Sequence, residues 1–236
     1  MKLPVSKTNA PVWRDITVKS VLPKALKTLE TLSRNLWWVW NSAAKNLFRD
    51  LDPDLWRATG ENPVMLLQQL PSERLEEVMN DAEMMDRIKN VFDMFNSYMA
   101  KPMRKDIPSV SYFSMEYGLC NCLKIYSGGL GVLAGDYIKE ASDSCVDMTA
   151  IGFLYRYGYF TQSLSVDGQQ IANYEPQNFN QLPIEQVTDE NGHPLILEVP
   201  YPGRIIYSHI WRVNVGRMKL YLLDTDFDMN SEYDRS

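Results

Sequence analysis

The sequence predicts an α/β protein in which a layer of helices precedes a partly parallel sheet. Three observations predict this class: apolar residues recur every three or four positions over residues 22–100, short β-prone runs begin after Pro108, and a glycine-rich turn separates the first two of these runs. A chain of 236 residues has room for one or two domains with a sizeable core. We therefore expect a helical domain over residues 1–105 and an α/β domain over residues 106–236.

The helical region predicts several short helices whose starts carry capping residues. Asp52 and Asn62 each precede a proline, so the side-chain oxygen can accept from the first free amides while the proline fits the first turn. Ser72 and Asn80 are further cap candidates, and Asn80 has the spacing of a capping box with Glu83. One apolar face runs through the first helices and comprises Leu26, Leu29, Leu32, Leu36, Trp40, Ala44 and Leu47.

Three tryptophans, Trp37, Trp38 and Trp40, fall within four positions. Exposed indole rings can stack on the faces of sugars. On a helix, however, Trp37 and Trp40 are three positions apart and share a face. We therefore expect these two in the core and Trp38 against a neighbouring domain.

The α/β region predicts a strand–helix–strand unit followed by a hairpin. Residues 109–114 and 148–154 are typical of strands, and residues 132–146 between them fit a helix, which is the order of a parallel pair with a right-handed crossover. The β-prone runs 204–213 and 218–223 predict an antiparallel hairpin. So few parallel strands would leave the sheet open, so we expect the sequence to be the front part of a longer chain.

Composition and charge exclude several kinds of partner. The sequence has 24 Lys and Arg against 30 Asp and Glu, a net charge of −6, and no long run of like charge, which argues against binding to nucleic acid or to an anionic membrane. Residues 1–7 lack the apolar core of an export signal, and no apolar run approaches the ~20 residues that span a bilayer. We expect a cytoplasmic protein.

Cysteine and histidine do not predict a metal site. Cys120, Cys122 and Cys145 are too few and odd in number for a disulfide framework, and Cys-Asn-Cys lacks the spacing of a metal or redox motif. The two histidines, His193 and His209, stand far apart in the sequence. We expect reduced thiols in or near the core and no metal.

The segment from Ile125 to Asp136 is the most informative part of the sequence. Gly128, Gly129 and Gly131 fall within four residues just before the predicted helix, where glycine lets a ligand approach and the helix start attracts an anion. The ending of a nucleotide-binding P-loop is missing, and Gly-x-Gly-x-x-Gly is not in register. From the spacing alone, an oxyanion or phosphate site and a plain tight turn both stay open.

Several motifs in order resemble the α-glucan (glycogen, starch and maltodextrin) phosphorylase family. These motifs are Ser114-Met115-Glu116-Tyr117-Gly118, then residues 126–136, then Leu154-Tyr155-Arg156-Tyr157-Gly158-Tyr159-Phe160. Residues 36–41 and 51–56 resemble the extra helical domain of the bacterial and archaeal branch.

The resemblance implies a glycosyltransferase-B architecture, in which two Rossmann-like domains face each other across a cleft. It also implies transfer of a terminal glucose from an α-1,4-glucan to inorganic phosphate, which gives α-glucose 1-phosphate, with pyridoxal 5'-phosphate acting through its phosphate group. In the family the lysine that forms the Schiff base belongs to the second domain, outside this sequence. We therefore predict no catalytic residue here and an inactive isolated chain; homo-oligomerisation stays open.

The resemblance also assigns site residues. It maps the backbone amides that hold the glucosyl and phosphate groups onto Gly128, Gly129, Leu130 and Gly131. It places Glu116, Asp136 and Tyr155 near the cofactor, although an ion pair, a favourable charge at the helix start and plain packing are the respective structural alternatives. The sequence departs from the family at Cys120 and Tyr137, near which we expect histidine in relatives.

Two other functions compete with this interpretation. A glycogen or starch synthase also carries Gly-Gly-Leu near its first strand, but close to the N-terminus, after a lysine and without a long helical region ahead. A non-catalytic glucan-binding or interaction module would use the tryptophan cluster or an exposed sheet edge, and retardation on amylose would support it.

Overall fold

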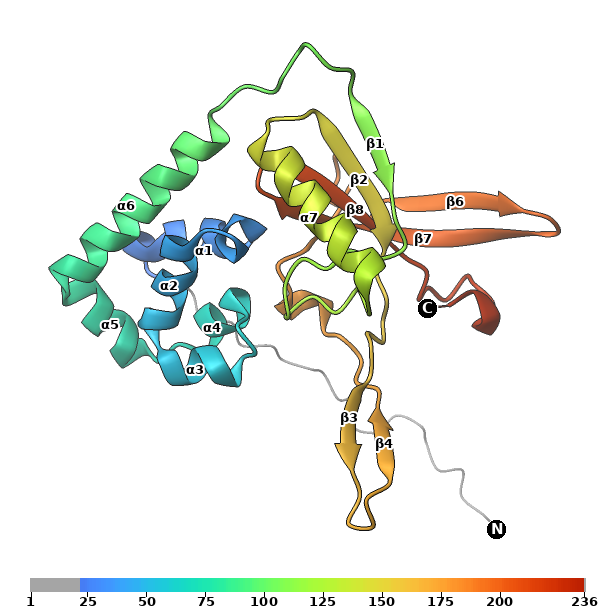
Figure 1. The fold of residues 1–236 in the computed structure, drawn as a ribbon, viewed down its shortest axis with the longest axis horizontal. Helices are drawn as coiled ribbons and strands as arrows, with labels where there is room; N and C mark the ends of the chain where they lie inside the picture. The colour runs from blue at the N-terminus through green and yellow to red at the C-terminus, as the bar shows by residue number, and fades with distance from the viewer. Residues whose placement is uncertain (1–21, 236) are drawn as a thin grey trace, which may run out of the picture.

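The helical layer and the sheet lie side by side, joined by an extended segment after the last helix of the layer (Figure 1). The computed structural model describes residues 22–235, so residues 1–7, for which we predict no export signal, lie outside the described residues. Buried side chains of both parts belong to one hydrophobic cluster. The expected boundary between residues 105 and 106 falls in the joining segment and stays a prediction.

The helical layer confirms the helical periodicity over the described part of residues 22–100. Its helices are the 3₁₀ helix η2 (Lys24–Leu26), α1 (Lys27–Ser33), the 3₁₀ helix η3 (Leu36–Val39), α2 (Ser42–Leu51), α3 (Pro53–Ala58), α4 (Pro63–Gln69), α5 (Ser72–Asn80) and α6 (Ala82–Met99). The predicted apolar face is buried at every position except Trp40, which is half-buried.

Two predicted caps are confirmed and two are wrong. The Asp52 side chain accepts from Asp54 and Leu55 at the start of α3, and Asn62 caps α4 in the same way. Asn80 does not cap α6: it is the last residue of α5, and Asp81 accepts from the Met84 amide instead. Ser72 is likewise the first residue inside α5, after Pro71, with no side-chain cap hydrogen bond.

The tryptophan cluster folds differently from our expectation. Trp37 is buried against Phe95, as predicted, but Trp38 is also buried, edge-on to Trp56 at a ring separation of 5.8 Å. Trp40, not Trp38, is the tryptophan that contacts a residue outside the helical layer. Its Nε1 donates to the Asp143 carboxylate at 3.2 Å. The long helix on which Trp37 and Trp40 would share a face does not form, because residues 36–39 make a short 3₁₀ helix that ends before Trp40, and its Leu36, Trp37 and Trp38 are all buried.

The sheet confirms the predicted parallel pair and the predicted hairpin. The strand order is β1-β2-β8-β7-β5, and β6 also pairs with β7. Neighbours β1, β2 and β8 are parallel, whereas β7 is antiparallel to β5, β6 and β8. The strands are β1 (Val110–Phe113), β2 (Met148–Phe153), β5 (Glu185–Gln186), β6 (Ile196–Tyr201), β7 (Arg204–Val215) and β8 (Met218–Asp224). The described sheet is thus mixed.

Helix α7 connects β1 to β2 but begins and ends three residues before the predicted range of 132–146. It runs from Gly129 to Asp143 because the glycines of the turn themselves form its first turn. Its C-terminal end is fixed by Cys145, whose φ of 56° lies in the left-handed region.

One short hairpin escapes the sequence prediction. Strands β3 (Thr161–Leu164) and β4 (Gln170–Asn173) form a separate hairpin that protrudes from the sheet (Figure 1). Strands β6 and β7 form a second hairpin, in which Gly203 adopts a φ of 81°. Both hairpins carry exposed apolar side chains, among them Leu164 and Ile205.

A polar junction joins the two layers. The Asn35 side chain donates to the Gly216 carbonyl and accepts from the Gly216 amide, both at 2.9 Å. Beside it the Arg217 guanidinium lies 3.7 Å from the centroid of the Tyr98 ring and donates to the Ser142 carbonyl. The layers are therefore held by directed hydrogen bonds as well as by the shared apolar core.

Candidate functional site

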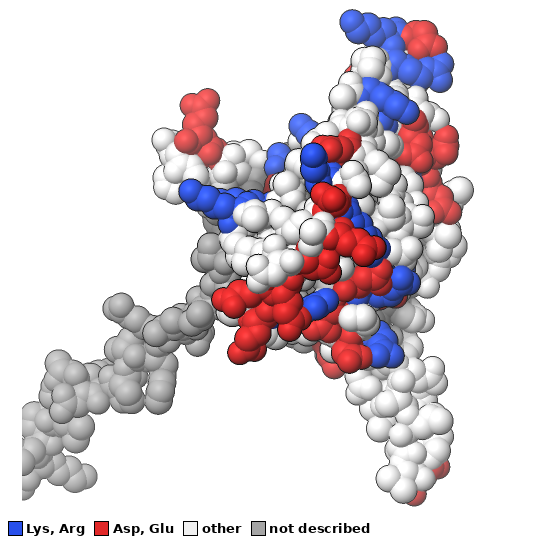
Figure 2. All heavy atoms as spheres, turned by 90° about the vertical axis from the view of Figure 1, so that its left-hand side faces the viewer, with Lys and Arg blue, Asp and Glu red and all other residues white. Residues whose placement is uncertain are grey.

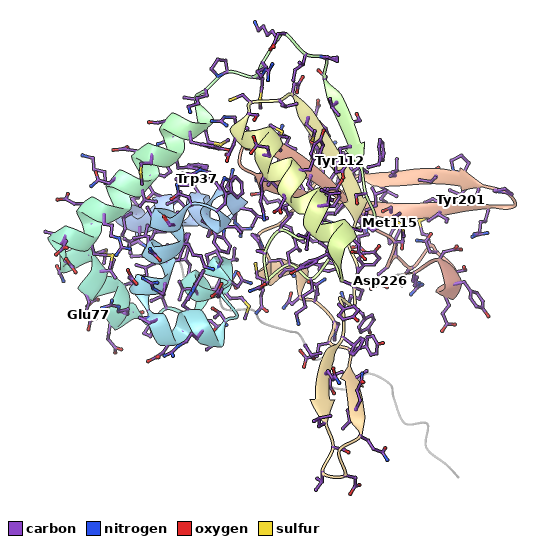
Figure 3. All side chains as sticks on the ribbon, viewed as in Figure 1. Trp37, Glu77, Tyr112, Met115, Tyr201 and Asp226 are labelled. Atoms are coloured by element: carbon purple, nitrogen blue, oxygen red, sulfur yellow. The ribbon has the colours of Figure 1, made fainter. Side chains whose placement is uncertain are left out.

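The carboxyl ends of the parallel strands meet at one edge of the sheet, and the polar side chains of the site come from this edge. Open α/β sheets bind ligands beyond the carboxyl ends of their strands. Glu116 follows β1, Tyr155 follows β2 and Asp224 ends β8. Figure 3 labels Met115 and Asp226 in this region, whereas Glu77 belongs to the helical layer on the other side of the molecule.

Glu116 is tied to the turn that opens α7. Its carboxylate accepts from the Ser127 hydroxyl at 2.9 Å and from the Ser127 amide at 3.2 Å. These bonds, together with the nearby amides of Gly128 and Gly131, hold the pKa of Glu116 below its ordinary range. The side chain is therefore ionised at neutral pH and positions the glycine turn.

The first turn of α7 keeps two amides available. The first hydrogen bond of the helix runs from the Val132 amide to the Gly128 carbonyl at 3.2 Å, so earlier amides have no partner within the helix. The Glu116 carboxylate faces the amides of Gly128 and Gly131. Within residues 22–235, no acceptor bonds the remaining amides, those of Gly129 and Leu130.

The glycines of this turn are of two kinds. A Cβ on Gly128 or Gly129 would have no atom within 4 Å, so the packing of this chain does not require glycine there. A Cβ on Gly131 would stand 2.4 Å from the Tyr126 Cβ, and one on Gly135 would stand 2.1 Å from the Gly118 carbonyl oxygen. Gly131 and Gly135 therefore serve close packing, whereas Gly128 and Gly129 leave open space beside the free amides.

A cavity of about 310 Å³ lies beside the turn. Glu116, Ser127 and Tyr155 line it, and the Tyr155 hydroxyl donates to the Met115 carbonyl at 3.0 Å. The other lining residues are mostly aromatic: Tyr126, Tyr157, Tyr159, Phe160 and Tyr174. The structure thus brings together Glu116 and Tyr155, two of the three residues that we place near the cofactor.

Asp136 lies apart from these two. It is in the second turn of α7, its side chain is 70% exposed, and it lies 3.7 Å from the Lys139 ammonium group. Tyr137, where we expect histidine in relatives, is also exposed and packs its ring against Tyr112 at 5.1 Å.

Two residues of this region escape the sequence analysis as site residues. Asp224 is buried at the end of β8, accepts from the Trp211 indole at 3.1 Å, and has its pKa raised by burial. Gln177 accepts from the Lys124 amide at 2.9 Å and donates to the Tyr155 carbonyl at 2.9 Å, so it anchors the segments on both sides of the cavity. The position of Asp224 at the end of an apolar strand is the signal that could have identified it.

The described residues contain neither a candidate metal site nor a candidate membrane span. Within residues 22–235 no three His, Cys, Asp or Glu side chains gather as a metal site requires. In the same part of the chain, no helix has both the length and the apolar character needed to cross a bilayer.

Comparisons with known proteins agree with the family resemblance of the sequence. Residues 22–123 match the family described as "Protein of unknown function (DUF3417)". The chain is 45% identical over 226 residues to maltodextrin phosphorylase of Thermococcus litoralis, covering 93% of this chain and 27% of that protein. It is 39% identical over 230 residues to glycogen phosphorylase of Mycobacterium tuberculosis (92% and 27%) and 39% identical over 216 residues to glycogen phosphorylase of Aquifex aeolicus (90% and 31%).

Each of these identities extends over 90–93% of the chain. The chain spans about a quarter of the length of the curated relatives that it matches. It is therefore a member of the α-glucan phosphorylase family and corresponds to the part of these enzymes that includes the DUF3417 region.

Proposed function

We propose that this chain supplies the glycine turn of the active site of an α-1,4-glucan phosphorylase, which transfers a terminal glucose to inorganic phosphate and releases α-glucose 1-phosphate. The observation that carries this proposal is the open space at Gly128 and Gly129 beside the free amides of Gly129 and Leu130. We further propose that the sheet belongs to the first Rossmann-like domain of a glycosyltransferase-B fold, in a cytoplasmic enzyme.

The turn fits a phosphate group in both shape and charge. Free amides at the start of a 15-residue helix, supported by the helix dipole, stabilise an anion. The amides of Gly129 and Leu130 would donate to a phosphate oxygen, and glycine at 128 and 129 would leave room for the ligand. Fixed dipoles of this kind stabilise the charge that moves during glucosyl transfer.

The other residues hold the turn and line the cavity. The ionised Glu116 fixes Ser127 and hence the direction of the following amides. Tyr155 would close the cavity on the side of β2, and the exposed Asp136 would face the second domain.

The glycine turn also suits the phosphate group of pyridoxal 5'-phosphate, which supplies a second phosphate in the reaction. The part of the chain that would lie next to this phosphate is the turn at Gly128–Gly131, with Glu116 and Tyr155 beside it. The turn would offer backbone amides as donors and an open space of suitable shape. The lysine that carries the cofactor lies outside the sequence described here.

Paired glycine substitutions test the proposal in the intact enzyme that contains this chain. Gly129→Ala adds a methyl group that meets nothing in the chain, so we expect an unchanged melting temperature and a kcat/KM for phosphate that is lower by about 100-fold. Gly135→Ala is the matched control in the same helix, because its methyl group clashes with Gly118; we expect it to lower the melting temperature. Unchanged phosphorolysis in the Gly129→Ala enzyme would refute the assignment.

A further inference from the structure

The loop between β1 and the glycine turn holds two thiols in close contact. The Sγ atoms of Cys120 and Cys122 are 2.8 Å apart, a contact that the proposed phosphorolysis does not use. Both cysteines are free and partly exposed. A disulfide has a shorter S–S distance of about 2.05 Å, so a small movement would suffice to bond the sulfurs.

Backbone geometry explains why the pair meets. The Leu123 amide lies 3.4 Å from the Cys120 carbonyl oxygen in the geometry of a hydrogen bond, so residues 120–123 form a tight turn. Such a turn brings the first and third Cα atoms to a separation that a disulfide tolerates. The flanking Leu119 and Leu123 are buried and hold both ends of the turn in place.

The two sulfurs differ in chemical character. The hydrogen bond with Cys122 and the positive charge of Lys139 lower the pKa of the Cys120 thiol. The same hydrogen bond, burial and the negative charge of Glu61 raise the pKa of Cys122. Cys120 is therefore the better nucleophile and Cys122 the resolving thiol.

A path to solvent is present. Cys122 lines a cavity of about 370 Å³ together with Asn121 and Lys124. The cavity reaches Cys122, and Cys120 is itself partly exposed, so a small oxidant can reach both sulfurs without unfolding of the chain.

We propose that Cys120 and Cys122 form a two-thiol modification site that a peroxide converts into a reversible intramolecular disulfide. The Cys120 thiolate attacks one peroxide oxygen, the O–O bond breaks, and the departing oxygen leaves as water after taking a proton, which gives a sulfenic acid. The Cys122 sulfur then attacks the Cys120 sulfur and displaces the hydroxyl group, which leaves as a second water with the Cys122 proton. Two thiols are oxidised to one disulfide, and one hydrogen peroxide is reduced to two waters.

The disulfide would stiffen the approach to the candidate site. The turn leads into Lys124, whose amide and carbonyl are both bonded by Gln177. Gly158 packs so close to Lys124 that a Cβ there would stand 2.4 Å from the Lys124 Cβ. A covalent link at residues 120–122 therefore acts on a segment that has little freedom to adjust.

Thiol mapping by mass spectrometry tests the proposal on the intact protein that contains this chain. After treatment with hydrogen peroxide, we expect the peptide with Cys120 and Cys122 to lose two hydrogen atoms and its labelling by iodoacetamide to fall by about tenfold, with recovery after dithiothreitol. Cys145, at the far end of α7, should keep its labelling.

Two cysteine variants distinguish disulfide formation from other oxidation of the thiols. Cys145→Ser is the matched control and should form the disulfide as the wild type does. Cys122→Ser should instead accumulate sulfenic or sulfinic acid at Cys120, because the resolving thiol is absent. Addition of oxygen atoms to either thiol of the wild type without loss of the hydrogen pair, persistent labelling of both, or intermolecular disulfides alone would overturn the proposal.

Discussion

The Glu116 carboxylate joins the end of β1 to the glycine turn through both the amide and the hydroxyl of Ser127. These donors favour the ionised form and lower its pKa. A lowered carboxyl pKa stabilises the fold at pH values above the ordinary value for Glu, about 4.3, and this contribution is lost as the pH falls through the lowered value.

We therefore expect the turn to loosen in acid before the sheet does. Amide hydrogen exchange at Ser127, measured from neutral to acidic pH and corrected for intrinsic rates, should lose protection as Glu116 protonates. Glu116→Gln should lower protection at neutral pH and remove this pH dependence. If wild-type protection were the same at all pH values, the carboxylate would not hold the turn.

The glycine turn could be predicted from the sequence. Which of its glycines serve close packing and which leave open space could not. Gly131 and Gly135 are fixed by Tyr126 and by Gly118, contacts that exist only once the loop folds back on α7. The hydrogen bonds between Glu116 and Ser127 also join separate segments. Local patterns show where a backbone can approach a ligand, whereas tertiary contacts decide which glycine the ligand needs.

Helix α4 depends on a cap that also connects the two layers. The Asn62 oxygen accepts from the amides of Val64 and Met65, and its nitrogen donates to the Gln181 carbonyl at 2.8 Å. The residue is only 2% exposed. Its removal would leave the partly buried Gln181 carbonyl without this donor as well as a helix without its cap.

We expect Asn62→Ala to lower the free energy of unfolding by about 2–3 kcal/mol, the sum of a lost cap and a partly buried carbonyl that loses its donor. Asp52→Ala is the comparison, because Asp52 caps α3 without a bond to the other layer, and it should cost about 1 kcal/mol. Urea unfolding of both variants measures the difference. Equal losses would mean that the bond to Gln181 adds nothing.

Elements with one buried face could be predicted, and elements without one could not. The alternation in residues 218–223 agrees with β8, whose residues are alternately buried and less buried. Strand β3 has four exposed residues and therefore no pattern for the sequence to reveal. At the start of α6 the cap was predicted one residue too early, because Asn80 and Asp81 are both good caps and packing decides where α5 ends.

Acidic side chains gather on the outer face of the helical layer (Figure 2). Figure 2 shows the outer face of the helical layer, where Asp and Glu side chains gather among fewer Lys and Arg side chains. A face that carries excess negative charge repels phosphodiesters. The excess of acidic residues on this face agrees in sign with the net charge of −6. A polyanion is therefore a poor partner for this face.

The chain covers only about a quarter of the length of its phosphorylase relatives. We expect the isolated 236-residue chain to release no glucose 1-phosphate from maltodextrin and phosphate, because the turn provides only one wall of the proposed site. A coupled assay for glucose 1-phosphate checks this, with the intact enzyme as the positive control. Turnover by the isolated chain would show that the second domain is dispensable.

The contact between Asn35 and Gly216 joins residues that are 181 positions apart. A ribosome that adds about 5–20 residues per second needs roughly 10–40 s to make the intervening chain. During that time the helical layer has been synthesised but its partner in the sheet has not. The Asn35 side chain is then solvated, and the surface of the layer that later contacts the sheet is exposed. Chaperones would have access to this surface throughout that interval. The interval ends when the hairpin of β7 and β8, which contains Gly216, has been made and covers the surface.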